Sequence, residues 1–207
     1  MKEEIRAAYE ELVEWADLIF AQTREKFGSL VKCQPGCTDC CYAVFGLFPV
    51  EAVYLREKFD ELPEEQRRAA LERAAEAEGQ LMELERKLAR HPDDPYMQNR
   101  IMARERVRCP LLDEKGECIL YPFRPLTCRV YGIPVLVKGR AQICWKAGFE
   151  PGEKYPTFNL DTAYRELYRL SQKLLGEEEK AGLLLSLPLV LRTPVENLLN
   201  GNWKNKT

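Results

Sequence analysis

The sequence predicts a mainly α-helical fold with a small β-hairpin, an α+β protein in which helices surround an irregular cysteine-rich core and a long helical arm projects. Three observations predict it. Long stretches repeat apolar residues at helical spacing or are rich in Ala, Glu, Arg and Leu, which favour helices. Two short apolar runs flank a Lys-Gly turn, which is typical of a hairpin. The eight cysteines fall into two groups about 70 residues apart in the sequence, which favours one core that closes over both.

The N-terminal part begins with an amphipathic helix over residues 3–27, and Gly28 follows as its stop. Apolar residues recur in it at helical spacing, namely Ile5, Tyr9, Val13, Ala16 and Phe20. The first cysteine group, CQPGCTDCC, occupies residues 33–41, and we expect Pro35 and Gly36 to form a turn there.

Residues 42–48 are aromatic and β-branched enough for a short strand or extended segment. Pro49 then opens a helix that we expect to reach about Phe59, because proline is favoured in the first helical turn.

The middle of the chain predicts a helical arm, residues 63–106, inserted between the two cysteine groups. We expect one helix from Pro63 to about Arg90 and another from about Pro95 to Arg106, with Asp93 or Asp94 near its cap. Apolar positions are sparse in the arm, so its charges predict a solvated face rather than a binding site. We expect residues 1–207 to form a single domain whose cysteine-cluster core spans residues 33–144.

The second cysteine group begins at Cys109, and we expect a turn over residues 113–116. Residues 133–144 predict a β-hairpin that turns at Lys138-Gly139 and delivers Cys144. Helices are expected over residues 159–177, with Asp161 as a cap, and over residues 179–200, with breaks at Pro188 and Pro194.

Composition argues against several classes of protein. A chain of 207 residues with 45% hydrophobic and 31% charged residues can bury a core without disulfides. The net charge of −2 offers no general attraction to nucleic acid or anionic lipid, so neither partner is expected. The longest apolar run, residues 183–191, is about half a membrane span. The N-terminus lacks the pattern of an export signal, so we expect a cytoplasmic, reducing location.

Clustered cysteines in a reducing compartment are more often metal ligands or redox groups than disulfides. The spacing C-x3-C-x2-C-C lets several thiols reach one centre, and soft thiolates favour zinc, cuprous copper or iron–sulfur clusters. We expect the side chains of adjacent Cys40 and Cys41 to point apart. Either one binds a metal while the other packs as a small hydrophobic residue, or the two face different metals. Simple burial and disulfides are the alternatives. The candidate metal ligands are all eight thiols, namely Cys33, Cys37, Cys40, Cys41, Cys109, Cys118, Cys128 and Cys144.

The metal itself stays open between zinc and an iron–sulfur cluster, in one or two centres, because four thiolates suit both. The spacers of eight, nine and fifteen residues in the second group lack the paired knuckles of zinc ribbons, which favours iron slightly. His91, beside Pro92 on the predicted arm, lies away from both groups and is not expected to be a ligand.

Arg124 and Arg129 flank Cys128 and are candidate cofactor-binding residues. Guanidinium groups could offset the negative charge of a four-thiolate centre. They could equally bind an anionic substrate or act as ordinary salt-bridge partners. The spacing C-x3-C-x2-C also occurs in radical S-adenosylmethionine enzymes, but Asp39 stands where those enzymes have an aromatic residue, and the βα repeats of their barrel are missing.

Several motifs occur together in a familiar order: CQPGCTDCC, FPVEA, CPLL, GECILY and RPLTCR. They resemble the YkgJ-type cysteine-cluster family, the CxxCxxCC proteins named as zinc- or iron-chelating, over residues 33–144. The family opens with C-x2-C-x2-C-C, whereas three residues separate Cys33 from Cys37 here, which makes the role of Cys33 less certain. The resemblance implies that Cys109, Cys118 and Cys128 form the second conserved group and that Cys144 closes it.

The resemblance supplies no biochemical activity. A related pattern occurs in flagellin lysine N-methylases, yet no glycine-rich nucleotide loop follows a strand in this chain. The leading hypothesis is therefore a metal-binding protein that holds zinc or an iron–sulfur cluster through its thiolates. The alternatives are a metal-dependent enzyme, such as a methyltransferase or oxidoreductase, and an adaptor with a purely structural metal whose arm binds a protein partner.

Overall fold

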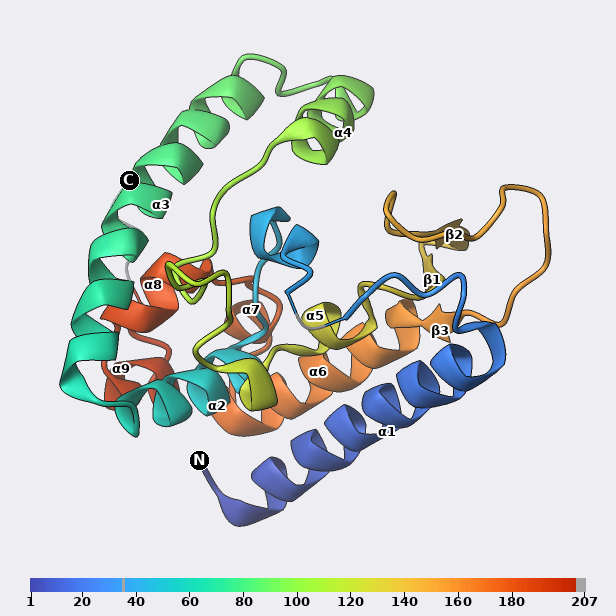
Figure 1. The fold of residues 1–207 in the computed structure, drawn as a ribbon. Helices are drawn as coiled ribbons and strands as arrows, with labels where there is room; N and C mark the ends of the chain where they lie inside the picture. Colours follow the sequence, from blue (N-terminus) through green and yellow to red (C-terminus); the bar gives the residue numbers. More distant parts are fainter. Residues whose placement is uncertain (35, 204–207) are drawn as a thin grey trace.

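The structure is a computed structural model that describes residues 1–34 and 36–203, so Pro35, half of the predicted turn, lies outside the described residues. It confirms the mainly helical fold with a small sheet (Figure 1). Three helices pack together as a base: α1 (Glu3–Phe27), α2 (Pro49–Asp60) and α6 (Leu160–Leu175). Tyr9, Val50 and Leu167 are almost fully buried in the core that these helices share.

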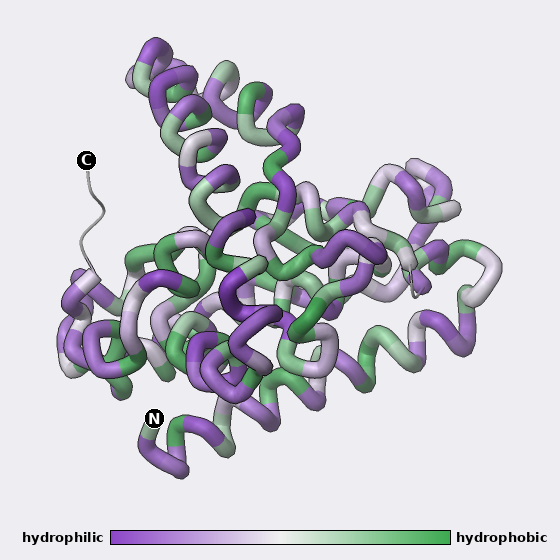
Figure 2. The backbone as a smooth tube through the Cα atoms, turned by 60° about the vertical axis from the view of Figure 1, so that its left-hand side comes forward, coloured by the Kyte–Doolittle hydropathy of each residue, from purple (hydrophilic) through white to green (hydrophobic). Residues whose placement is uncertain are grey.

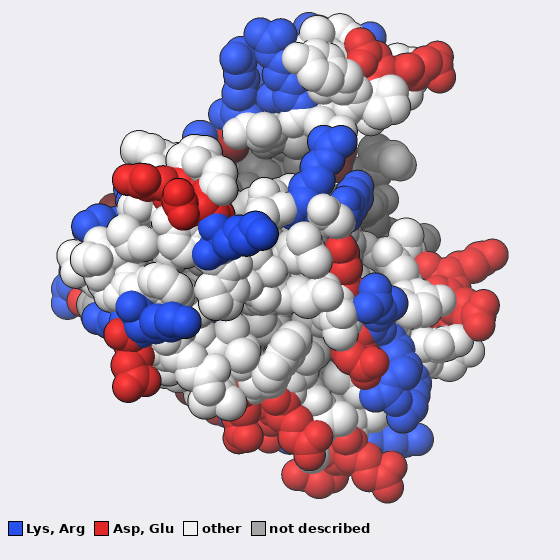
Figure 3. Space-filling model, turned by 90° about the vertical axis from the view of Figure 1, so that its right-hand side faces the viewer, with Lys and Arg blue, Asp and Glu red and all other residues white. Residues whose placement is uncertain are grey.

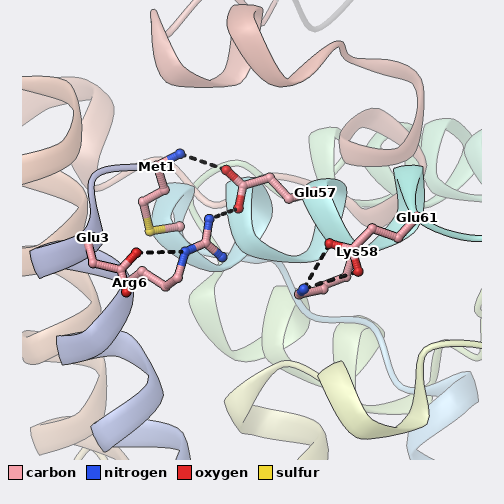
Figure 4. A network of polar contacts seen from close by, with 6 residues as sticks. All are labelled: Met1, Glu3, Arg6, Glu57, Lys58 and Glu61. Atoms are coloured by element: carbon pink, nitrogen blue, oxygen red, sulfur yellow. Dashed lines mark hydrogen bonds and ion pairs between the residues drawn. The ribbon is translucent and has the colours of Figure 1, made fainter.

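Helix α1 has the predicted bounds and is attached to α2 at its start. Acidic residues lie in its first turn and basic residues in its last, which suits the helix dipole. Glu57 on α2 accepts hydrogen bonds from the Met1 amino group at 2.7 Å and from Arg6 Nη2 at 2.6 Å (Figure 4). The two helices are thus joined by charge as well as by apolar packing.

Helix α2 begins at Pro49 as predicted, and its buried Glu51 joins it to the short helix α5 (Leu126–Val130). The Glu51 carboxylate accepts hydrogen bonds from the backbone N–H groups of Phe48 (3.3 Å) and Leu126 (2.9 Å). Burial raises the pKa of Glu51 to about 7, although these hydrogen bonds act in the opposite direction.

The arm consists of α3 (Glu64–Ala89) and α4 (Pro95–Arg104), and Asp94 caps α4 by accepting from Met97 N–H. Both predicted helices are confirmed, with the second ending slightly early. The first half of α3 is less solvated than predicted, because Ala70, Ala74 and Ala77 are buried and α3 packs against α8 (Leu187–Arg192). The rest of the arm stands away from the body (Figure 2).

The predicted hairpin is confirmed by β1 (Val135–Val137) and β2 (Arg140–Gln142), which pair antiparallel. Lys138 and Gly139 both have positive φ, which this tight turn requires. A third strand, β3 (Phe158–Asn159), pairs parallel with β1. It was not predicted, because two residues carry no detectable alternation.

The C-terminal part differs from the prediction in three ways. Asn159, not Asp161, caps α6; the Asp161 carboxylate instead accepts from Lys138 N–H. The helix expected over residues 179–200 is more interrupted than predicted, since the chain forms α7 (Glu178–Ala181), α8 (Leu187–Arg192) and α9 (Val195–Leu199); the predicted break at Pro194 is confirmed. Pro188 lies within the first turn of α8, where proline is tolerated, instead of breaking a helix.

The segment before α2 is extended but forms no strand. Tyr42 belongs to a short 3-10 helix, η1 (Asp39–Tyr42), and Leu47 makes a single antiparallel bridge to Leu185, with N–H···O distances of 2.8 and 2.9 Å. This bridge explains the gap between α7 and α8, because the chain must extend there to pair.

Charges of both signs are interspersed on the face that Figure 3 shows, including the tip of the arm, which carries basic and acidic groups side by side. Across residues 1–34 and 36–203, none of the helices is both long and apolar enough to cross a membrane.

Candidate metal centre

The backbone brings the two cysteine groups together. Cys109 N–H donates to the Cys41 carbonyl at 2.7 Å, and Val107 N–H donates to the Tyr42 carbonyl at 3.2 Å. These bonds lie directly after the arm, so the chain returns to the first cysteine group as soon as α4 ends. Two stretches that are distant in sequence therefore share one site.

Seven of the eight cysteines line one cavity of about 510 Å³. The eighth, Cys144, lines a smaller neighbouring hollow together with Cys33, Cys37 and Cys40. The seven that line the large cavity are Cys33, Cys37, Cys40, Cys41, Cys109, Cys118 and Cys128. All eight are free of disulfides and partly buried.

Cys40 lies at the centre of the group. Its Sγ atom lies 4.0 Å from that of Cys41, and the nearby Cys128 thiol acts to lower its pKa. The expectation that Cys40 and Cys41 point apart is therefore wrong: the 3-10 turn of η1 lets neighbouring thiols meet. A sulfur–sulfur separation of this size is close to the edge of a tetrahedral zinc–thiolate site, about 3.8 Å for bonds of about 2.3 Å.

Burial raises the pKa of Cys109, Cys118 and Cys144, and backbone N–H groups just after each cysteine act in the opposite direction. These groups belong to Leu111 and Leu112 for Cys109, to Leu120 for Cys118, and to Lys146 and Ala147 for Cys144. Backbone donors around sulfur stabilise the thiolate form that metals bind.

The thiols resist ionising together. Burial, reinforced by neighbouring cysteines, raises the pKa of Cys33 to about 11 and that of Cys109 to about 12. Hydrogen bonds from Cys128 and Cys41 lower the pKa of Cys40 to about 3, so Cys40 is the thiol that carries negative charge first. Multiple thiolates can coexist here only if a cation compensates their charge.

Asp39 organises the outer edge of the site and was missed as a functional candidate. Its carboxylate is buried and accepts from Arg106 Nη2 (2.8 Å), Trp145 Nε1 (3.1 Å) and Cys144 Sγ (3.5 Å). Burial acts to raise the pKa of Asp39, but the charge of Arg106 and these hydrogen bonds outweigh it and lower the pKa. Asp39 thus fixes the position of Cys144, a link that no sequence spacing indicates.

Cys33 packs directly against Gly132. A Cβ atom at Gly132 would lie 2.3 Å from Cys33 Cβ and 3.1 Å from Cys33 Sγ. Any side chain there would displace Cys33, so this glycine is needed for space.

The two candidate arginines occupy different environments. Arg124 lines the cavity, lies over the Tyr121 ring at 3.7 Å, and acts to lower the pKa of Cys40 and Cys118. Arg129 is buried and donates to Asp17 Oδ2 (2.5 Å) and to the carbonyls of Arg124 (2.9 Å) and Pro122 (2.5 Å). The contacts of Arg129 match the salt-bridge alternative, whereas Arg124 faces the thiols.

Within residues 1–34 and 36–203, no group of three or more His, Cys, Asp or Glu side chains is already placed to hold a metal ion. The donor chemistry fits a thiolate-bound metal, but the sulfur atoms would have to close in around it. His91 lies between α3 and α4, where its backbone carbonyl accepts a hydrogen bond from Gln98 Nε2.

The structure is therefore a helical base that carries two converging cysteine stretches. Residues 32–144 match the model of the CxxCxxCC family, described as "Putative zinc- or iron-chelating domain". The match covers more than half of the chain, and the protein belongs to this family. Neither the curated proteins nor the solved structures that were compared contain a match.

Proposed function

We propose that this protein chelates a transition metal through cysteine thiolates from both groups, as zinc or as an iron–sulfur cluster. The observation that carries the proposal is the position of Cys40, whose Sγ atom lies 4.0 Å from that of Cys41 within a cavity that five further cysteines line. Thiolates suit both zinc and iron–sulfur clusters.

The electrostatics supply the driving force. Buried thiols with raised pKa values repel one another when ionised, and a bound cation removes that penalty while releasing protons. We assign Arg124 to the same task, since its guanidinium group lies beside the thiols and can offset the remaining negative charge.

We divide the ligands into an inner and an outer group. The inner group is Cys40, Cys41, Cys109, Cys118 and Cys128. The outer group is Cys33, Cys37 and Cys144, which line the smaller hollow with Cys40. This arrangement supports a second centre next to the first, within a single domain that we expect to work in the reducing cytoplasm.

Metal analysis and a visible spectrum of anaerobically purified protein test the proposal. Stoichiometric metal is expected: brown protein with iron and sulfide indicates a cluster, whereas colourless protein with zinc excludes electron transfer. Cys40→Ser and Cys128→Ser should each lower the metal content strongly. Unchanged content in both would overturn the proposal. Cys144→Ser is the matched comparison, because it should remove only metal bound by the outer group.

An enzyme that uses the centre is the second candidate, and the size of the cavity beside the thiols favours it. The adaptor alternative, in which the arm binds a protein partner, gains less support, because α3 and α4 contribute Ala77, Leu81 and Met102 to the wall of this cavity.

A further inference from the structure

The large cavity continues well beyond the cysteines. Its other walls come from the extended segment before α2, from the arm and from the start of α8, and they are almost entirely apolar. The main contributors are Val44, Phe45, Leu47, Leu81, Met102 and Leu187. These side chains are not needed to bind a metal, so their convergence calls for another explanation.

The volume of the cavity also indicates a site for a small molecule. Small-molecule sites typically enclose about 300–1,000 Å³ with mainly apolar walls and a few polar groups. The observed 510 Å³ lies within this range. A metal held by sulfur bonds of about 2.3 Å would occupy only the cysteine end. Room for an apolar molecule remains between the arm and the body.

Arginine supplies the polar end of this cavity. The Nε atoms of Arg108 and Arg124 are buried and have no hydrogen-bond acceptor among the described residues, and both side chains line the cavity. Arg108 already donates through Nη2 to Glu114 Oε1 at 2.9 Å. The Arg124 guanidinium carbon lies 3.7 Å from the centroid of the Tyr121 ring, a cation–π contact that holds this group at the cavity wall. A guanidinium group held in this way suits a carboxylate.

We propose that the cavity binds an amphipathic carboxylate, whose apolar body lies against Leu47, Leu81 and Met102 and whose head group pairs with Arg124. The position of the ligand beside a metal rests on the proposed function, in which Arg124 also offsets thiolate charge; the cavity and its apolar walls do not. The arm then closes one side of a ligand site.

Binding of sodium decanoate to the anaerobically purified full chain, measured by titration calorimetry, tests this inference. Acetate supplies the head group alone and 1-decanol the apolar body alone. Decanoate should bind at least tenfold more tightly than either. Equal binding of decanoate and 1-decanol would overturn the role of the carboxylate, and no binding of decanoate would overturn the site.

Two variants locate the ligand. Leu81→Trp should fill the cavity and weaken decanoate binding at least tenfold, whereas Met82→Trp, on the exposed face of the same helix, should leave it unchanged. Arg124→Gln should lower the affinity of the protein for decanoate to its affinity for 1-decanol. Equal affinities in Leu81→Trp and wild type would overturn the location.

Metal content is measured in every sample, and decanoate binding is repeated after chelation. Wild-type protein without metal contradicts the proposed function alone. Protein that keeps its metal but does not bind decanoate contradicts the ligand site alone.

Discussion

The helical base and the first cysteine loop, residues 32–41, are held together by different forces. In the base, Tyr9, Phe59 and Leu167 are at most 1% exposed. In the described part of the loop, residues 32–34 and 36–41, the one buried side chain is the charged Asp39. Apolar burial therefore specifies the base without any ligand, whereas the loop depends on polar contacts and on whatever its thiols bind.

Chelation should give the largest contrast between the two regions. The Cys37 and Cys41 amides donate to the Gln34 and Thr38 carbonyls, within the loop itself. Removing the metal is therefore expected to speed hydrogen exchange at these two amides. Amides of α1 and α6 should keep their protection. Equal loss in both regions would show that the base also depends on metal.

Leu167→Ala should affect the opposite region. Leu167 is fully buried on α6, so its truncation is expected to lower the free energy of unfolding by about 2–5 kcal/mol. Denaturant unfolding measures this loss. Metal stoichiometry of the folded variant should equal that of wild type, and a fall in stoichiometry would contradict the separation of the two regions.

Glu51 gives the base its own pH dependence. Because its folded pKa of about 7 exceeds the unfolded value, its contribution is fully present below about pH 4.3 and is lost as the pH rises through 7. The stability of wild type relative to Glu51→Gln should therefore fall by about 3 kcal/mol between pH 4.5 and 7.5. Taking the difference cancels other titrating groups such as Cys40, and a constant difference would refute the prediction.

Gly132→Ala should have the smallest effect on stability and a selective effect on the loop. Its new Cβ atom would collide with Cys33 Cβ and push this outer thiol away. We expect reduced metal content, measured by elemental analysis, with little change in denaturant unfolding of the base. Gly148→Ala is the control, because its Cβ atom would come no closer than 3.4 Å to Leu30.

Sequence patterns predicted the long elements well, because helical periodicity and caps are local. The helices α1, α2 and α3 and the hairpin all lie close to their expected bounds. Where tertiary contacts decide, the prediction was wrong: the bridge between Leu47 and Leu185 interrupts the expected C-terminal helix.

The candidate site was predicted in composition but not in arrangement. Spacing identified the cysteines, yet it could not indicate that Cys128 lies near enough to Cys40 to shift its pKa, or that Asp39 fixes Cys144. These contacts join residues far apart in the chain, and no local rule encodes them. The apolar walls of the cavity were missed for the same reason, because Leu184, Leu187 and Pro188 meet the cysteines only in the tertiary structure.

Two backbone hydrogen bonds, from Val107 and Cys109 to the Tyr42 and Cys41 carbonyls, fix the end of the arm against the first cysteine group. The chain between the two cysteine groups is therefore a closed loop. A change in the number of residues at the tip of the arm, between α3 and α4, alters only the length of this loop. Doubling the length of such a loop costs only about 0.6 kcal/mol. Relatives with longer or shorter tips should therefore keep both cysteine stretches in the same register, and the tip is the part of this chain that is freest to diverge.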